Sequence, residues 1–255
     1  MTKAAVTEQN LVDVPLYTAL DVARYLRVPV WLVACAWQGR LPHPDLCFEW
    51  VMEHFRHFEL YCDSSDIPQL SDRWSFRQVA DFYVRVFAFH SLVELSDRPE
   101  CSESKTPFRI PWKALWLRPV PVFFGDHSPE EGIASVVQAS RPWLDETAAP
   151  WLEKRLRMCL GRFDGVGAEL TRLYPFTRMP VEGSPRTVVM DPRIRFGRPT
   201  VANYGTPTDI ILERHQAGES IAELTEDYGI PAADVEEAIR FEARPFFPLV
   251  PYFLW

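Results

Sequence analysis

The sequence predicts a mainly α-helical protein. A helix-turn-helix at the N-terminus and a three-helix unit at the C-terminus are expected to flank a helical middle region with a few short strands. Apolar residues recur at helical spacing in residues 16–37 and 74–95, and three helix-sized pieces after residue 207 are separated by Gly218 and by Gly229-Ile230-Pro231. Four prolines between residues 107 and 124 allow only short or edge strands there.

The N-terminal helix-turn-helix is predicted in residues 1–45. Thr18 is placed to cap the first helix, and Asp21 stands in for the acid of a capping box. The inner face of this helix is expected to consist of Leu20, Ala23 and Leu26. Val28-Pro29 breaks the helix, and a second helix ends at Trp37.

The middle region, residues 46–174, is expected to contain one helix over residues 46–61 and another over residues 74–95. The second carries apolar residues on nearly every face, which indicates that it is buried. One small domain offers too little surface to cover all of these faces. The pattern therefore predicts a homodimer, with this helix or the C-terminal three-helix unit in the interface.

A third helix of the middle region is expected within residues 151–163, where the pattern is amphipathic. The side chains expected to face inward are Leu152, Leu156, Cys159, Leu160 and Phe163. Those expected to face outward are basic: Lys154, Arg155, Arg157 and Arg162. This basic face is a second candidate surface for phosphate, although a charged face is usually only solvated. Residues 175–186 follow as a linker.

The C-terminal unit is predicted in residues 187–244. It begins with a short apolar strand and a hairpin that carries Arg193, Arg195 and Arg198, and the three helices follow. Ten acidic residues against two arginines between residues 207 and 243 account for the whole net charge of −8. Such an acidic unit repels phosphates at short range, so we expect its helices to form a protein-binding or dimerising surface.

The same segment resembles the small winged-helix domain known as a domain of unknown function, family four-three-three, which is widespread in predicted VapB-type antitoxins. The residues that carry the resemblance are Asp191-Pro192, Gly197-Arg198-Pro199, Ala217 to Ser220, Asp227-Tyr228 and Glu236 to Phe241. The chain has Asn203-Tyr204-Gly205-Thr206 where the family usually has a glycine-threonine-arginine-isoleucine turn. Any role of that family arginine is therefore not carried over.

The N-terminal segment looks like the first helix-turn-helix of MerR-type regulators, and its pairing with the C-terminal domain resembles an antitoxin architecture. Its second helix is apolar and the C-terminal helices are acidic, so neither offers the arginine, lysine or amide side chains that read base edges. DNA contact is therefore expected from residues beside the helices. These candidates are Arg24, Arg27, Arg40, Arg193, Arg195 and Arg198.

The tail, residues 245–255, is uncharged and contains five aromatic residues and three prolines. Prolines exclude a regular helix, and so much apolar surface must be buried, either on this chain or on a partner. In VapB-type antitoxins a C-terminal segment covers the toxin, and the resemblance implies the same role here. The expected partner contacts are Arg244, Phe246, Phe247, Tyr252, Phe253 and Trp255.

Catalysis and metal binding are not expected. His54 and His57, near Glu53, Cys47 and Cys62, fit no common zinc spacing, and no nucleophile or phosphate-loop motif is present. Neither a cofactor nor a metal is therefore predicted. Five scattered cysteines indicate reduced thiols in a cytoplasm, and neither a secretory signal nor a membrane span is expected.

These observations lead to one function and one alternative. The resemblance implies an antitoxin-like regulator of a prokaryotic toxin-antitoxin module, which binds a PIN-type toxin and operator DNA in transcription regulation. The alternative is a degenerate pair of helix-turn-helix units that acts only as a protein-interaction scaffold.

Overall fold

A computed structural model describes residues 11–28, 30, 33, 73–96, 123–124, 128–144, 146–165 and 170–243. Within these residues the chain is mainly helical, as predicted, with three short two-stranded sheets. The helices of the first two thirds are α1 (Ala19–Leu26), α4 (Phe76–Ser96), α7 (Pro129–Ser140) and α8 (Ala148–Leu160). Those of the C-terminal unit are α9 (Thr208–Gln216), α10 (Ile221–Tyr228) and α11 (Ala232–Ala243).

Helix α1 begins at the predicted capping box. The Thr18 hydroxyl accepts a hydrogen bond from the Asp21 amide at 3.1 Å, and the Asp21 carboxylate accepts one from the Thr18 amide at 2.8 Å. The buried face consists of Ala19, Val22, Ala23 and Leu26, whereas Leu20 is exposed. The expectation for Leu20 is wrong because the buried residues follow an i, i+3, i+4, i+7 spacing that starts at residue 19. Of the predicted second helix, only Val30 and Val33 lie within the described residues.

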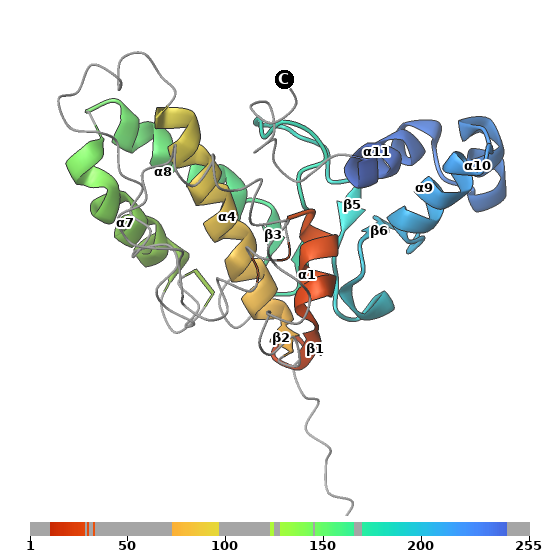
Figure 1. Ribbon diagram of the computed structural model, residues 1–255, viewed down its shortest axis with the longest axis horizontal. Helices are drawn as coiled ribbons and strands as arrows, with labels where there is room; N and C mark the ends of the chain where they lie inside the picture. The colour runs from red at the N-terminus through yellow and green to blue at the C-terminus, as the bar shows by residue number, and fades with distance from the viewer. Residues whose placement is uncertain are drawn as a thin grey trace, which may run out of the picture.

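Helix α4 is buried as predicted. It starts at Phe76, after β2 (Trp74–Ser75) has paired antiparallel with β1 (Pro15–Tyr17). Figure 1 shows α4 running beside α8, and the two helices pack together. Phe82 and Phe89, on faces that a single domain seemed unable to cover, are buried within one copy of the chain. Because these faces of α4 are covered within a single chain, they do not require a second copy to cover them. Dimerisation through the C-terminal unit stays a prediction.

Helix α8 has the predicted inner face, since Leu152, Leu156 and Cys159 are fully buried. Arg155 and Arg162 were expected to face solvent with Lys154 and Arg157, and this expectation is wrong. The Arg155 side chain is mostly buried, and it donates to the Pro180 carbonyl at 2.8 Å and to the Glu94 carboxylate at 2.8 Å. The basic face of α8 is therefore smaller than the sequence suggests.

Arg162, just beyond α8, is 5% exposed and holds the segment that was predicted as a linker. Its guanidinium donates to the carbonyls of Tyr174 at 2.7 Å, Ser184 at 2.7 Å and Pro185 at 2.6 Å. Burial lowers the pKa of Arg162. Carbonyl oxygens satisfy the donors that burial removes from water, so the segment that was predicted as a linker is fixed against α8.

The C-terminal unit begins with β5 (Val188–Val189), which pairs antiparallel with β6 (Thr200–Val201). We call residues 188–201, which include both strands and the loop between them, the arginine hairpin. Helices α9, α10 and α11 follow at one end of the molecule, with α1 between them and α4 (Figure 1). Their core is separate from the main core and contains Val201, Ile211, Leu224, Ile230, Val235 and Ala238. Two further short strands, β3 (Phe163–Asp164) and β4 (Arg172–Leu173), pair antiparallel ahead of the hairpin.

No helix in the described part of the chain is long and apolar enough to cross a membrane.

Replacement of Arg162 by Lys is expected to lower the free energy of unfolding by about 3 kcal/mol, because a single ammonium group cannot satisfy all of these buried carbonyls. Arg157→Lys is the matched control, since Arg157 is an exposed arginine of α8 that pairs with Glu153 at 2.9 Å. Its effect should stay within about 0.5 kcal/mol. Urea unfolding of both variants measures the difference, and equal effects would contradict the structural role of Arg162.

Candidate functional site

The carboxylate of Asp209 joins the N-terminal helix to the arginine hairpin. Asp209 is buried in the first turn of α9. Arg24 of α1 donates to its Oδ2 atom at 2.6 Å, and Arg198 donates to the same atom from Nε at 3.0 Å. Two residues expected to contact DNA, from opposite ends of the sequence, are therefore brought together on one acid.

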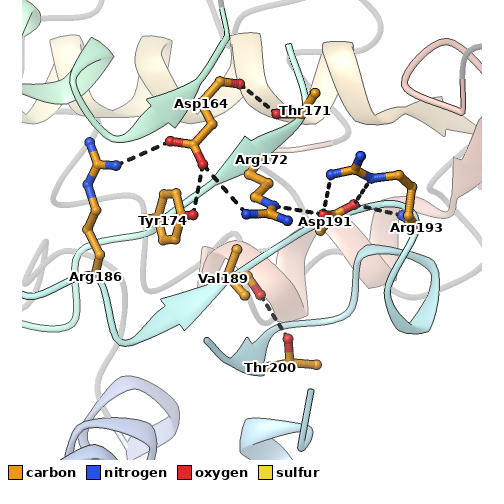
Figure 2. A network of polar contacts seen from close by, with 9 residues as sticks. All are labelled: Asp164, Thr171, Arg172, Tyr174, Arg186, Val189, Asp191, Arg193 and Thr200. Atoms are coloured by element: carbon orange, nitrogen blue, oxygen red, sulfur yellow. Dashed lines mark hydrogen bonds and ion pairs between the residues drawn. The ribbon is translucent and has the colours of Figure 1, made fainter. Parts of the chain in front are cut away.

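A second buried carboxylate, Asp191, organises the other side of the hairpin, and Figure 2 shows the network around it. Arg193 donates to it from Nη2 at 2.7 Å and from its backbone amide at 2.9 Å, and Arg172 of β4 donates at 2.9 Å. Burial alone raises the pKa of Asp191. The hydrogen bonds from Arg193 and Arg172 outweigh burial and hold the pKa below its usual value.

The same network continues to Asp164 on β3. Tyr174 donates its hydroxyl to this carboxylate at 2.8 Å, and Arg186 donates to it at 3.2 Å (Figure 2). Arg172 lies 3.9 Å from Asp164 and so bridges the two acids. The hairpin is thus tied to β3 and β4 by charged hydrogen bonds.

The arginine hairpin keeps a positive charge in spite of these ion pairs. Residues 188–201 carry Arg193, Arg195 and Arg198 against one acid, Asp191, and Arg198 pairs with Asp209 outside this segment. The side chains of Arg24 and Arg193 are 54% and 53% exposed, which leaves their outer edges open to solvent. Arg195 is also exposed, and within the described residues it forms no ion pair. We call these exposed guanidinium groups of Arg24, Arg193 and Arg195 the arginine surface.

The tip of the hairpin has an unusual backbone. Arg195, Phe196 and Gly197 are consecutive residues with φ angles of 51°, 55° and 75°, all in the left-handed region. This conformation costs a residue with a Cβ atom roughly 1–2 kcal/mol. Phe196 is nevertheless 77% exposed, so burial of its ring does not offset the cost. Backbone strain of this kind is often found where a protein contacts a ligand.

Tyr17 of β1 supports the tip from below. A Cβ atom added at Gly197 would lie only 2.0 Å from the Tyr17 hydroxyl, so no other residue fits there without displacing the ring. The hydroxyl is buried and has no hydrogen-bond partner among the described residues. Tyr17 also meets the ring of Tyr25 edge to face, with centroids 6.3 Å apart. Burial, then Tyr25 and Asp191, raises the pKa of Tyr17.

Two further acids of the C-terminal unit are also buried and used within the chain. Glu242 accepts hydrogen bonds from Thr208 at 2.6 Å and from Arg27 of α1 at 3.3 Å. Burial raises the pKa of Glu242, although the Thr208 hydrogen bond and the charge of Arg27 act in the opposite direction. Arg27 is the fifth predicted DNA contact within the described residues, and it pairs with the Glu242 carboxylate.

Glu237 of α11 connects the C-terminal unit to the segment before the arginine hairpin. It accepts a hydrogen bond from the Thr177 hydroxyl and pairs with Arg178 and Arg240. Burial alone raises the pKa of Glu237, but the hydrogen bonds from Arg178 and Thr177 and the charge of Arg240 lower it on balance. Asp209, Glu237 and Glu242 belong to the ten acids that were expected to form a partner surface, but they make contacts within the chain. Other acids of the same set are exposed. These include Glu213, Glu223, Glu226 and Glu236.

Several predicted site residues cannot be placed. Arg40, the tail contacts from Arg244 to Trp255, and His54 and His57, which were considered and rejected as zinc ligands, lie outside the described residues. Within the described ranges, no group of three or more His, Cys, Asp and Glu side chains could hold a metal ion.

Sequence reasoning missed Asp191, Asp209, Arg172 and Tyr17. Two signals were present. Asp191-Pro192 was part of the family resemblance, and Asp209 occupies the first turn of a predicted helix, where an acid is favourable. The contribution of Arg172 and Tyr17 had no local signal, because both act through contacts with distant segments.

Comparison with known proteins bears on the C-terminal unit. Residues 188–241 match the model of a family described as "Protein of unknown function (DUF433)". The C-terminal unit is thus similar to DUF433 domains. The match runs from β5 into α11 and does not include the N-terminal helix. This is the family that the C-terminal segment was expected to resemble from its sequence motifs.

Comparison of the whole chain with curated proteins finds no match. The crystal structure of Rv2018 from Mycobacterium tuberculosis is similar with a TM-score of 0.48 and 18% identity, covering 89% of this chain and 98% of that one.

Asp209→Asn is expected to lower the free energy of unfolding by about 2 kcal/mol, because it removes the charge-assisted hydrogen bonds that join α1 to the hairpin. Glu213→Gln is the matched control, since this acid is exposed on the same helix. It should change stability by less than about 0.5 kcal/mol. Thermal unfolding of both variants at one ionic strength makes the comparison, and a stable Asp209→Asn protein would show that this junction contributes little.

Proposed function

We propose that this chain is an antitoxin-like regulator of the VapB type, which binds a PIN-type toxin and also contacts operator DNA. The observation that supports it most directly is the arrangement of charge in the C-terminal unit. The domain combines an electropositive hairpin with helices that expose acids, so one compact unit offers two surfaces of opposite sign.

The DNA contact is assigned to the arginine surface. The hairpin carries three arginines against Asp191, so positive charge remains beside the pairs with Asp191 and Asp209, and Arg195 adds its full charge. Contacts of this type attach a protein to phosphates and carry no sequence information. Helix α10 exposes Glu223, Glu226 and Asp227, so it does not suit the major groove.

The partner contact is assigned to the exposed acids and the tail. An acidic face attracts a basic protein surface, and an uncharged aromatic tail can cover an apolar one. A homodimer through the same acidic face is the other use of this surface.

The scaffold alternative also has an observation in its favour. Arg27 is matched by Glu242, and Arg24, Arg193 and Arg198 all have carboxylate partners, so much of the predicted DNA charge serves the fold. In this case the helix-turn-helix units would only bind proteins.

Substitution of Arg193, Arg195 and Arg198 by alanine is expected to weaken binding to upstream DNA uniformly across sequences. Arg193 and Arg198 also hold buried acids, so Arg195→Ala is the cleaner variant. It should reduce the slope of log K against log salt by about one unit. Arg141→Ala, at an exposed position just after α7, is the control and should leave the slope unchanged. A wild-type protein that shows no gel shift at low salt would favour the scaffold alternative.

Deletion of residues 245–255 distinguishes a partner-binding tail from a tail packed on its own chain. If the tail covers the toxin, the truncated protein should keep its melting temperature but fail to restore growth to cells that express a PIN-type toxin encoded beside it. If the tail packs on this chain, the melting temperature should fall. A truncated protein that is less stable but still neutralises the toxin would contradict the partner role.

A further inference from the structure

Phe196 projects from the tip of the arginine hairpin. Most large apolar side chains in the described residues are buried, yet this ring is 77% exposed. The three residues of the tip keep a left-handed backbone, and Gly197 rests directly on Tyr17. Because the Tyr17 ring is itself buried, it gives the tip a firm base. The tip is therefore held in the conformation that exposes the phenyl ring.

The charges beside this ring indicate what it contacts. Arg195 precedes it directly, and Arg193 and Arg198 lie on either side within the same loop. Asp191 and Asp209, the carboxylates that bind these flanking arginines, are buried beneath them, so positive charge faces solvent. An exposed apolar ring in a loop that also carries three arginines matches a surface in which flat apolar groups lie between phosphates. This is the surface of a nucleic acid.

A duplex fits better than a single strand. Proteins that follow single strands place several aromatic rings along a groove, one for each successive base. Proteins that bend a duplex insert an isolated apolar side chain at a base step, while basic residues hold the adjacent phosphates. The hairpin tip offers one projecting ring with arginines on both sides, which corresponds to the second arrangement.

We propose that Phe196 is a wedge that enters a groove of duplex DNA and partly unstacks one base step, while Arg193, Arg195 and Arg198 contact the flanking phosphates. This inference rests on the proposed contact between the arginine surface and DNA, and it adds an apolar component that does not depend on salt. Flexible pyrimidine–purine steps are the preferred target, because they unstack most easily.

The test uses a labelled duplex with 2-aminopurine at a central pyrimidine–purine step. Binding of the wild-type protein should increase the 2-aminopurine fluorescence, because unstacking removes quenching. Phe196→Ala should weaken binding about tenfold, the size expected for one lost base contact, with an unchanged salt slope and no fluorescence increase. Phe196→Trp should restore both. Arg195→Ala should instead reduce the salt slope and retain the fluorescence increase.

Met179→Ala is the matched control, since Met179 is an exposed apolar residue on a different loop. It should bind as the wild type does. The wedge is wrong if Phe196→Ala binds like the wild type, if wild-type binding leaves the fluorescence unchanged, or if the isolated top strand shows the larger effect of Phe196→Ala. If wild-type protein binds neither DNA, the proposed DNA contact fails and the wedge fails with it.

Discussion

The sharing of Asp209 between Arg24 and Arg198 is the interaction on which the rest of this arrangement depends. One buried acid in the first turn of α9 binds the N-terminal helix and the arginine hairpin at the same time. A buried carboxylate without these partners would be costly, and each arginine without the acid would be free to move. Together with the Arg27–Glu242 pair, this junction holds α1 against the C-terminal unit, and Tyr17 of β1 contacts the hairpin tip nearby.

The acids of the C-terminal unit have two different roles. Asp209, Glu237 and Glu242 face inward and bind arginines or hydroxyl groups from earlier segments. Acids such as Glu226 and Glu236 remain exposed. Net charge alone cannot separate these groups, because it counts a buried, paired carboxylate and a solvated one equally. The contrast explains how a domain with a large negative charge can still present a positive hairpin.

Local patterns were enough to predict much of the fold. The capping box of Thr18 and Asp21, the buried helix in residues 76–96 and the three C-terminal helices each depend on neighbouring residues, and each was expected. Errors arose where a distant segment changes the environment. Arg162 looked solvent-facing by helical spacing, but residues 174–185 cover it and supply carbonyl partners. The arginines of the candidate site were identified, whereas the carboxylates that orient them were not, because ion pairing across the fold leaves no periodic signal.

The attachment of residues 174–185 to Arg162 has a consequence for modularity. The sequence suggests a flexible joint at this point, and the DUF433 match starts just after it. In the folded chain, however, the segment is fastened to α8 by Arg162 and to α11 through Thr177 and Arg178. We therefore expect the C-terminal unit and the segment before it to unfold together. The buried acids of this unit pair with arginines that lie outside it, Arg24, Arg27 and Arg178. If the unit were moved into another protein, that protein would have to supply basic side chains at these positions.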